Sequence, residues 1–345
     1  MLRDNRAVID QLIDDIGDFE EEEIRLGVCR QARRRPPGEY EHWKAIVANA
    51  VRTDAAPSPD LIVANQRLTQ WEAYLGIGQV SSFPVSVYFA LTDVCNARCA
   101  FCSYSPEVAA NRRVDLQDIQ RADWLKFSKL FLPNGNLSEP LAHPQIAEIF
   151  AAVRKLAPFI NLSVGTNGSL LNDRVIYAVT GYMKMMYVSI NAARKSTYEA
   201  IMPPLKWEKT ISNLARLRDH KVKLGTHLPE VIASVVANRY NIDELPELPS
   251  LLHGLGIEQL RIHILNVQGP ISDRTLMAAA DTPQATPAAS NRSFRALECE
   301  CEKYGVRLTH TLPAFDETTL PKFDLSPYVF PVGAGAALPT YVGRR

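Results

Sequence analysis

Residues 93–102, DVCNARCAFC, contain three cysteines in close succession. Their spacing is C-x3-C-x2-C, and they follow an apolar, strand-like run over residues 85–91. Iron–sulfur clusters are normally held by four cysteine thiolates. Three thiolates on one tight loop can bind three irons of a cubic [4Fe–4S] cluster and leave the fourth open, as catalytic zinc keeps an open position. The pattern therefore indicates a cluster with an exchangeable site, held by Cys95, Cys99 and Cys102.

Two other interpretations of the cysteines are a structural zinc site and a set of unrelated buried thiols. A structural zinc site usually comprises two pairs of ligands, and no second C-x2-C or H-x3-H pair follows in the sequence. Unrelated thiols would not be expected in this order directly after a strand. A non-catalytic scaffold that binds a cluster or zinc remains the alternative from a different functional class.

The composition agrees with a globular enzyme and gives the chain no net charge. The chain has 345 residues, 46% of them hydrophobic, and 38 basic side chains balance 38 acidic ones. A balanced charge excludes a global field that would recruit nucleic acid or an anionic membrane. No apolar stretch approaches the ~18 residues of a membrane span, and acidic residues near the N-terminus argue against a secretory signal. An oxygen-sensitive cluster belongs in a reducing compartment, so we expect a cytoplasmic location.

The order of predicted elements indicates an α/β fold. Residues 1–80 have helical periodicity, broken by a proline-rich segment at 55–59. From residue 85 onward β-rich runs alternate with helical patterns, which argues for βαβ units and a parallel sheet. Strands are predicted at 85–91, 159–165, 186–191, 231–237 and 259–265, with a weakly marked one near 134–137, and helices at 61–75, 117–131, 144–155, 173–180, 207–220 and 242–255. Six such units fit an open (β/α)6 partial barrel, whose functional residues would follow the strand C-termini.

The cysteine motif, with the aromatic Phe101 before its third cysteine, resembles the signature of the radical SAM superfamily. The resemblance implies a partial (β/α)6 TIM-type barrel, here with an N-terminal helical extension. It also implies that S-adenosylmethionine (SAM) chelates the open iron and is cleaved to a 5′-deoxyadenosyl radical. Phe101 is then a cofactor-binding residue.

Three further segments, in the expected order, carry the same resemblance. Residues 135–144, GNLSEPLAHP, are similar to the family's Gly-Gly-Glu-Pro segment, although Leu137 and Ser138 replace the two glycines. This implies that Glu139 and Ser138 contact the amino group of SAM. Residues 163–168, SVGTNG, resemble the third strand and make Thr166 a SAM contact.

The fourth strand, residues 187–192, resembles the family's Ser-Ile-Asn-Ala pattern. Its period of two points Ser189 and Asn191 to one face, where the ribose and the carboxylate of SAM would bind them. Ser234, in the middle of the fifth predicted strand, is a further candidate. No catalytic acid, base or hydrogen donor can be assigned from the sequence.

The C-terminal third contains two more cysteines, Cys299 and Cys301. Their C-x-C spacing suits two irons of one cubane poorly, so we predict helical cysteines without a metal and no complete cysteine-rich C-terminal domain of the SPASM type. The predicted domains are a helical extension over 1–80, a barrel over 81–270 and a helix/strand extension and tail over 271–345.

The sequence thus predicts a radical SAM enzyme of oxidoreductase or lyase type. Its expected substrate is a small polar metabolite or natural-product intermediate that is oxidised, epimerised, decarboxylated or subjected to elimination. A reducing partner such as flavodoxin or ferredoxin would supply the electron, with no nucleic-acid or membrane partner. A peptide-modifying maturase of the SPASM type is the alternative within the superfamily.

Overall fold

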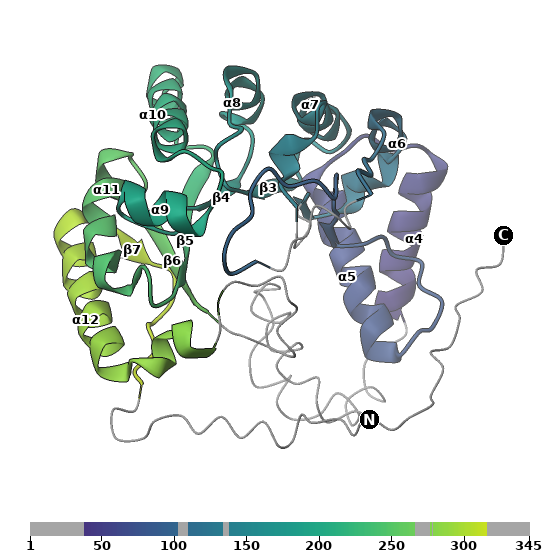
Figure 1. The fold of residues 1–345 in the computed structure, drawn as a ribbon. Helices are drawn as coiled ribbons and strands as arrows, with labels where there is room; N and C mark the ends of the chain where they lie inside the picture. The colour runs from purple at the N-terminus through teal and green to yellow at the C-terminus, as the bar shows by residue number, and fades with distance from the viewer. Residues whose placement is uncertain (1–37, 103–109, 134–137, 266–276, 278, 316–345) are drawn as a thin grey trace, which may run out of the picture. The chain divides into compact units, whose positions relative to one another are not determined.

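The computed structural model describes residues 38–102, 110–133, 138–265, 277 and 279–315 (Figure 1). The helix predicted before residue 38, the strand predicted near 134–137 and the C-terminal tail lie outside these residues. The chain divides into two compact units that alternate along the sequence. One comprises Met1–Tyr88, Asp115–Leu132 and Glu148–Leu162, and the other Phe89–Val114, Pro133–Ala147 and Ser163–Arg345.

Seven parallel strands make up the sheet, and their spatial order is their order in the sequence. Helices connect successive strands, so the predicted α/β partial-barrel architecture is confirmed. The strands are β1 Ser86–Tyr88, β2 Leu130–Leu132, β3 Asn161–Thr166, β4 Met185–Ser189, β5 Glu230–Ala237, β6 Gln259–Ile264 and β7 Arg307–Leu308.

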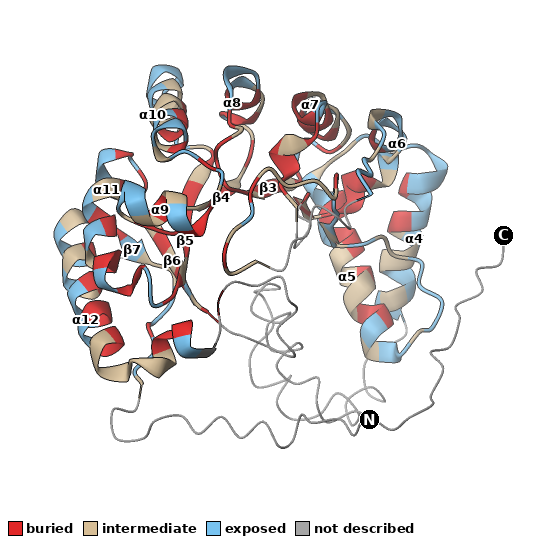
Figure 2. Cartoon of the chain, in the orientation of Figure 1, coloured by how far each residue is buried: buried red, intermediate tan, exposed pale blue. Residues whose placement is uncertain are grey.

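Strands β4, β5 and β6 present two different faces. Ser189, Ser234 and Arg261 are Cα partners in one row across the three strands and therefore share a face. The neighbouring row, one residue earlier, consists of Val188, Ala233 and Leu260, and all three are fully buried. Figure 2 colours the chain by burial, with buried segments in red. Because side chains alternate along a strand, the apolar face is the one that packs under the helices, and the polar face is the inner face of the barrel.

Helices α4 and α5 confirm the predicted N-terminal helices. The side chain of Ser58 caps α5 by accepting a hydrogen bond from the Leu61 N–H at 3.3 Å, and Gly76 ends the helix in the left-handed conformation. The Asn65 amide, fully buried on α5, donates to the carbonyls of Phe83 and Phe127 at 3.0 and 3.1 Å. This polar link fixes α5 within its own unit.

The remaining helices mostly follow the prediction. Those of the βαβ units are α6 Leu116–Gln120, α7 Ile146–Leu156, α8 Asp173–Val179, α9 Lys195–Ile201, α10 Trp207–Leu224 and α11 Leu248–Gly254, while α4 spans Gly38–Arg52, α5 Pro59–Leu75 and α12 Pro287–Tyr304. Short 3-10 helices also occur, among them η1 Asp123–Phe127, η2 Pro140–Ala142 and η3 Ile242–Glu247. In the described part of the chain, no helix combines the length and the apolar character needed to cross a membrane.

The helix predicted over residues 117–131 is wrong in its second half. Helix α6 ends at Gln120, a 3-10 helix follows, and Leu130–Leu132 is strand β2. This strand pairs with β1 on one side and β3 on the other. A short apolar run fits either a helix or a buried strand by periodicity alone, and here pairing on both sides decides the outcome.

Candidate active site

The cysteine loop begins on a segment that residues 110–114 hold in place. Thr92 and Arg113 form an antiparallel bridge. The Asp93 carboxylate accepts hydrogen bonds from Arg112 Nε and the Ala110 N–H, both at 3.1 Å. These contacts lower the pKa of Asp93 against the desolvation that opposes them. The chain therefore enters the first cysteine along a fixed path.

The far side of the loop is anchored on α9. The backbone N–H of Arg98 donates to the Pro203 carbonyl at 2.6 Å, and that of Ala100 to the Ile201 carbonyl at 2.8 Å. Ala97 and Ala100 are buried in a cluster with Tyr198 and Ile201, and Cys95, Cys99 and Phe101 pack against it. Small residues between the cysteines allow this close approach, so the loop's conformation is set by packing as well as by hydrogen bonds.

The thiols of the loop lie close enough to influence one another. Burial first, and then the neighbouring thiols and Glu139, raise the pKa of Cys99 to about 12 and that of Cys95 to about 11. A site that disfavours thiolates in this way suits a metal centre, because iron supplies the positive charge that thiolates need. Among the described residues no three His, Cys, Asp or Glu side chains converge as ligands of a single ion. A cubane needs no such convergence, since its thiolates bind separate irons.

Glu139 connects the cysteine loop to the third strand. Its backbone N–H donates to the Val94 carbonyl at 2.9 Å. Its carboxylate accepts three hydrogen bonds, from Thr166 Oγ1 at 2.6 Å and the N–H groups of Asn167 at 2.7 Å and Leu141 at 3.1 Å. Although these bonds favour the charged form, burial raises the pKa of Glu139 to about 7.

All three donors to Glu139 are neutral, so its carboxylate has no cationic partner among the described residues. An unpaired buried charge is costly, and a cationic ligand would compensate it. Beside it, the Ser138 hydroxyl oxygen is buried and has no hydrogen-bond partner in the described structure. Buried polar atoms are normally satisfied. Both observations fit the positively charged amino group of SAM.

The turn after β3 forms the second wall of the site. Thr166 Oγ1 donates to Glu139 and accepts from the Gly168 N–H at 3.0 Å. Gly168 has a φ of +74°, and a Cβ there would lie 3.2 Å from Val188 Cγ1, so only glycine fits without strain. The turn's shape thus directs Thr166 and the Asn167 N–H toward Glu139.

Asn96 was not singled out from the sequence. Its amide oxygen accepts from Asn167 Nδ2 and its amide nitrogen donates to Ser169 Oγ, both at 2.9 Å. The residue directly after Cys95 is thereby locked to the turn after β3. No sequence signal marks it, because its partners lie more than 70 residues away.

The remaining predicted residues divide into two groups. Ser189 and Ser234 are partly exposed register partners on the inner face. Asn191 is buried, and its side chain accepts from the Val236 N–H at 2.7 Å and donates to Met202 Sδ at 3.3 Å. Its backbone carbonyl accepts from Asn241 Nδ2 at 2.8 Å. The structure thus joins Asn191 to the ends of neighbouring elements.

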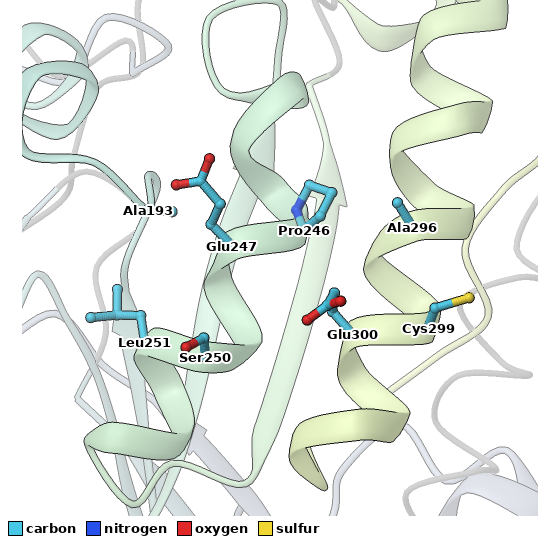
Figure 3. Close-up of a pocket in the computed structure, with 8 residues that line it drawn as sticks. All are labelled: Ala193, Pro246, Glu247, Ser250, Leu251, Ala296, Cys299 and Glu300. Atoms are coloured by element: carbon cyan, nitrogen blue, oxygen red, sulfur yellow. The ribbon is translucent and has the colours of Figure 1, made fainter.

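A surface pocket of about 740 Å³ lies elsewhere in the same unit (Figure 3). Glu247 and Ser250 line one side, and Cys299 and Glu300 on α12 line the other. None of its lining residues is a predicted cofactor residue. Both acidic residues of its lining have cationic partners among the described residues, Glu247 with Arg194 and Glu300 with Lys303.

Comparison with known proteins agrees with this geometry. Residues 89–251 match the model of the Radical SAM superfamily. The chain is 25% identical over 180 residues to the tungsten-containing aldehyde ferredoxin oxidoreductase cofactor-modifying protein of Pyrococcus furiosus, covering 51% of this chain and 50% of that protein. It is 23% identical over 185 residues to a GTP 3′,8-cyclase of Clostridium perfringens, covering 52% and 54%. The chain therefore spans about half the length of these curated relatives.

Among solved structures, Streptococcus suis SuiB bound to S-adenosylmethionine has a similar fold. The TM-score is 0.52 at 13% identity, over 79% of this chain and 60% of that one. This likeness supports the partial-barrel architecture. With the family match over residues 89–251 and the cysteine motif inside it, the chain contains a domain of the radical SAM superfamily, whose members use a [4Fe–4S] cluster and S-adenosylmethionine.

Proposed function

We propose that Cys95, Cys99 and Cys102 hold the cluster and that Glu139 and Ser138 hold the amino group of SAM beside it. The observation that carries this assignment is the pair of links made by Glu139. Its backbone binds the carbonyl of Val94, which directly precedes Cys95, and its carboxylate binds the turn after β3. When bound, the two cofactors supply a 5′-deoxyadenosyl radical that abstracts hydrogen from an unactivated C–H bond.

The protein residues in this proposal bind, orient and exclude water. The Glu139 carboxylate has four lone-pair positions and three donors, so one position remains for an ammonium group. The Ser138 hydroxyl oxygen would accept a second hydrogen bond from the same group. Phe101 packs against the group of buried apolar side chains that also contacts Cys95 and Cys99. There it would shield the iron–sulfur cluster from solvent.

Thr166 and Asn191 contribute by positioning in this proposal. The Thr166 hydroxyl donates its hydrogen to the Glu139 carboxylate and so orients that carboxylate. Only the Thr166 oxygen is then left to contact SAM. The side-chain amide of Asn191 is hydrogen-bonded to Val236 and Met202, so Asn191 would hold the end of β4 in place. Ser189 and Ser234, on the inner face, are the hydroxyls we assign to the ribose and the carboxylate of SAM.

For the substrate we propose a small polar metabolite or natural-product intermediate, undergoing oxidation, epimerisation, elimination or decarboxylation. Two relatives support a small molecule by their names, one a GTP cyclase and one a cofactor-modifying protein. The enzyme would then be of oxidoreductase or lyase type. A low-potential donor such as flavodoxin or ferredoxin would reduce the cluster.

The test is SAM cleavage by anaerobically reconstituted protein under reducing conditions. We expect 5′-deoxyadenosine from the wild type and none from Cys99→Ala, with Cys299→Ala as the matched cysteine control that cleaves normally. Wild-type protein that takes up zinc but no iron, and forms no 5′-deoxyadenosine, would support the metal-binding scaffold instead. A substrate screen would contain small polar compounds and peptides, and acceleration by peptides alone would contradict the small-molecule proposal.

A further inference from the structure

The inner face of the sheet carries a cation that the proposed chemistry does not use. Arg261 lies on β6, and its guanidinium carbon is 5.0 Å from the centre of the Tyr187 ring on β4. Strand β5 runs between these two strands, and parallel strands are about 4.8 Å apart. The side chains of Arg261 and Tyr187 therefore meet across β5 on the inner face, the face that also carries Ile232 and Ser234.

Within the described structure this guanidinium has no anionic partner. No described carboxylate forms an ion pair with it, and none of its N–H groups donates to a described acceptor. The acidic residue on the same face, Glu230, is bound to Lys184 at 3.0 Å and to Gln259 at 3.4 Å. A guanidinium has five donors in a rigid fork that suits carboxylate and phosphate. Its stacking on Tyr187 fixes that fork in place before a ligand arrives.

The surroundings of Arg261 include the two hydroxyls that we assign to SAM. Ser189 and Ser234 stand in the same row as Arg261. His263 lies two residues along β6 on the same face, and its pKa is lowered by partial desolvation of the ring and by the charges of Arg261 and His310. Arg261 therefore supplies the positive charge on this part of the inner face, beside the hydroxyls of Ser189 and Ser234.

We propose that Arg261, held on Tyr187, binds an oxyanion of the substrate, either a carboxylate or a phosphate, on the inner face of β4–β6. The inference rests on the proposed function, because it identifies the substrate class of the same barrel. It narrows the small polar substrate to an anionic one. SAM would use Glu139, Ser138 and the hydroxyls of Ser189 and Ser234, so its binding would not depend on Arg261.

The test is calorimetric titration of cluster-loaded, SAM-saturated protein in chloride buffer with three probes: inorganic phosphate, pyrophosphate and succinate. We expect saturable binding of at least one probe, and the probe that binds distinguishes phosphate from carboxylate. Arg261→Ala should weaken it by about tenfold or more. Arg261→Lys should fall between wild type and alanine, because lysine keeps the charge but lacks the fork. Tyr187→Leu should weaken binding several-fold by releasing the guanidinium.

Arg295→Ala, on the exposed side of α12, is the matched control and should bind like wild type. If Arg261→Ala does not fold, as judged by circular dichroism, the lysine and Tyr187 variants carry the test. The proposal is overturned if no probe saturates the wild type, or if Arg261→Ala and Arg295→Ala bind alike. It is also overturned if Arg261→Ala weakens SAM and leaves the anions unaffected. Since binding is read without turnover, Arg261-dependent binding in a protein that forms no 5′-deoxyadenosine would contradict only the proposed function.

Discussion

Two groups of cysteines in this chain have opposite surroundings. Cys95 and Cys99 lie on a loop whose backbone is hydrogen-bonded on both sides, beside a buried carboxylate. Cys299 and Cys301 lie on α12, where residues two apart point about 200° from each other. Accordingly Cys299 is exposed and Cys301 is buried. The loop therefore presents its cysteines together as a set of metal ligands. The helix instead places one cysteine on the surface and packs the other in the core.

The largest expected effect is the loss of the first group. Replacing Cys95, Cys99 and Cys102 by alanine should abolish iron binding, because no other described thiols share a loop with the same geometry. Anaerobically reconstituted wild-type protein should hold about four irons and four sulfides and show the absorption of thiolate–iron charge transfer. Iron analysis and the visible spectrum measure both. Iron retained at the wild-type level by the triple variant would place the cluster elsewhere and remove the distinction between the two groups.

The next effect concerns Glu139, the buried carboxylate beside the first group. Glu139→Gln keeps the shape but removes the charge, and a charge-assisted contact is worth roughly 1.5–3 kcal/mol. We expect SAM affinity to fall by about tenfold to a hundredfold, while the cluster still assembles on untouched thiolates. Titration of SAM into the reduced protein, followed by the EPR signal of the cluster, measures this. Glu208→Gln, on the exposed face of α10, is the control. An unchanged titration in Glu139→Gln would mean that Glu139 serves only to join Val94 to the turn after β3.

A smaller effect should come from the turn that supports Glu139. Gly168→Ala places a side chain at a φ of +74° and within 3.2 Å of Val188 and 3.3 Å of Thr210. We expect a loss of about 1–3 kcal/mol in the free energy of unfolding, measured by denaturant titration. Gly181→Ala is a matched control, since its φ is +78° but no atom lies within 4 Å of the added Cβ. Both variants place alanine at a positive φ, so any additional loss of unfolding free energy in Gly168→Ala comes from crowding. Equal losses in the two variants would show that the turn after β3 can relax around the added methyl group.

Much of the fold could be predicted because its signals are local. Strands β3, β5 and β6 begin and end within two residues of their predicted bounds, since apolar runs bounded by turns mark them. Strand β2 was missed because three residues are too few to show a period. The cysteines and Glu139 were found from their spacing. Asn96 and Arg261 were not, because their roles depend on partners from other strands and turns. Such register and long-range contacts do not appear in a single sequence.

The domain boundaries and the roles of individual site residues remain predictions for the same reason. The compact units of the structure interleave along the chain, so a boundary near residue 80 or 270 has no simple counterpart in them. Contact residues for a cofactor follow from shape and charge only after the fold has brought them together. Glu139 illustrates this, because only the fold shows that its carboxylate has three neutral donors and no cationic partner among the described residues.

The smallest expected effect comes from replacing the second group, the two cysteines of α12. Cys299→Ala and Cys301→Ala, made together, should leave the iron content unchanged, because a helix cannot direct both thiols to one cluster. Cys299 is exposed and should contribute nothing measurable to stability. Cys301 is 4% exposed and burial raises its pKa to about 11, as for a thiol that packs as an apolar group. Its loss should cost about 1 kcal/mol of unfolding free energy through the small cavity left behind. Iron analysis of the double variant decides the matter, and a fall to about half of the wild-type iron would reveal a second cluster held with the help of α12.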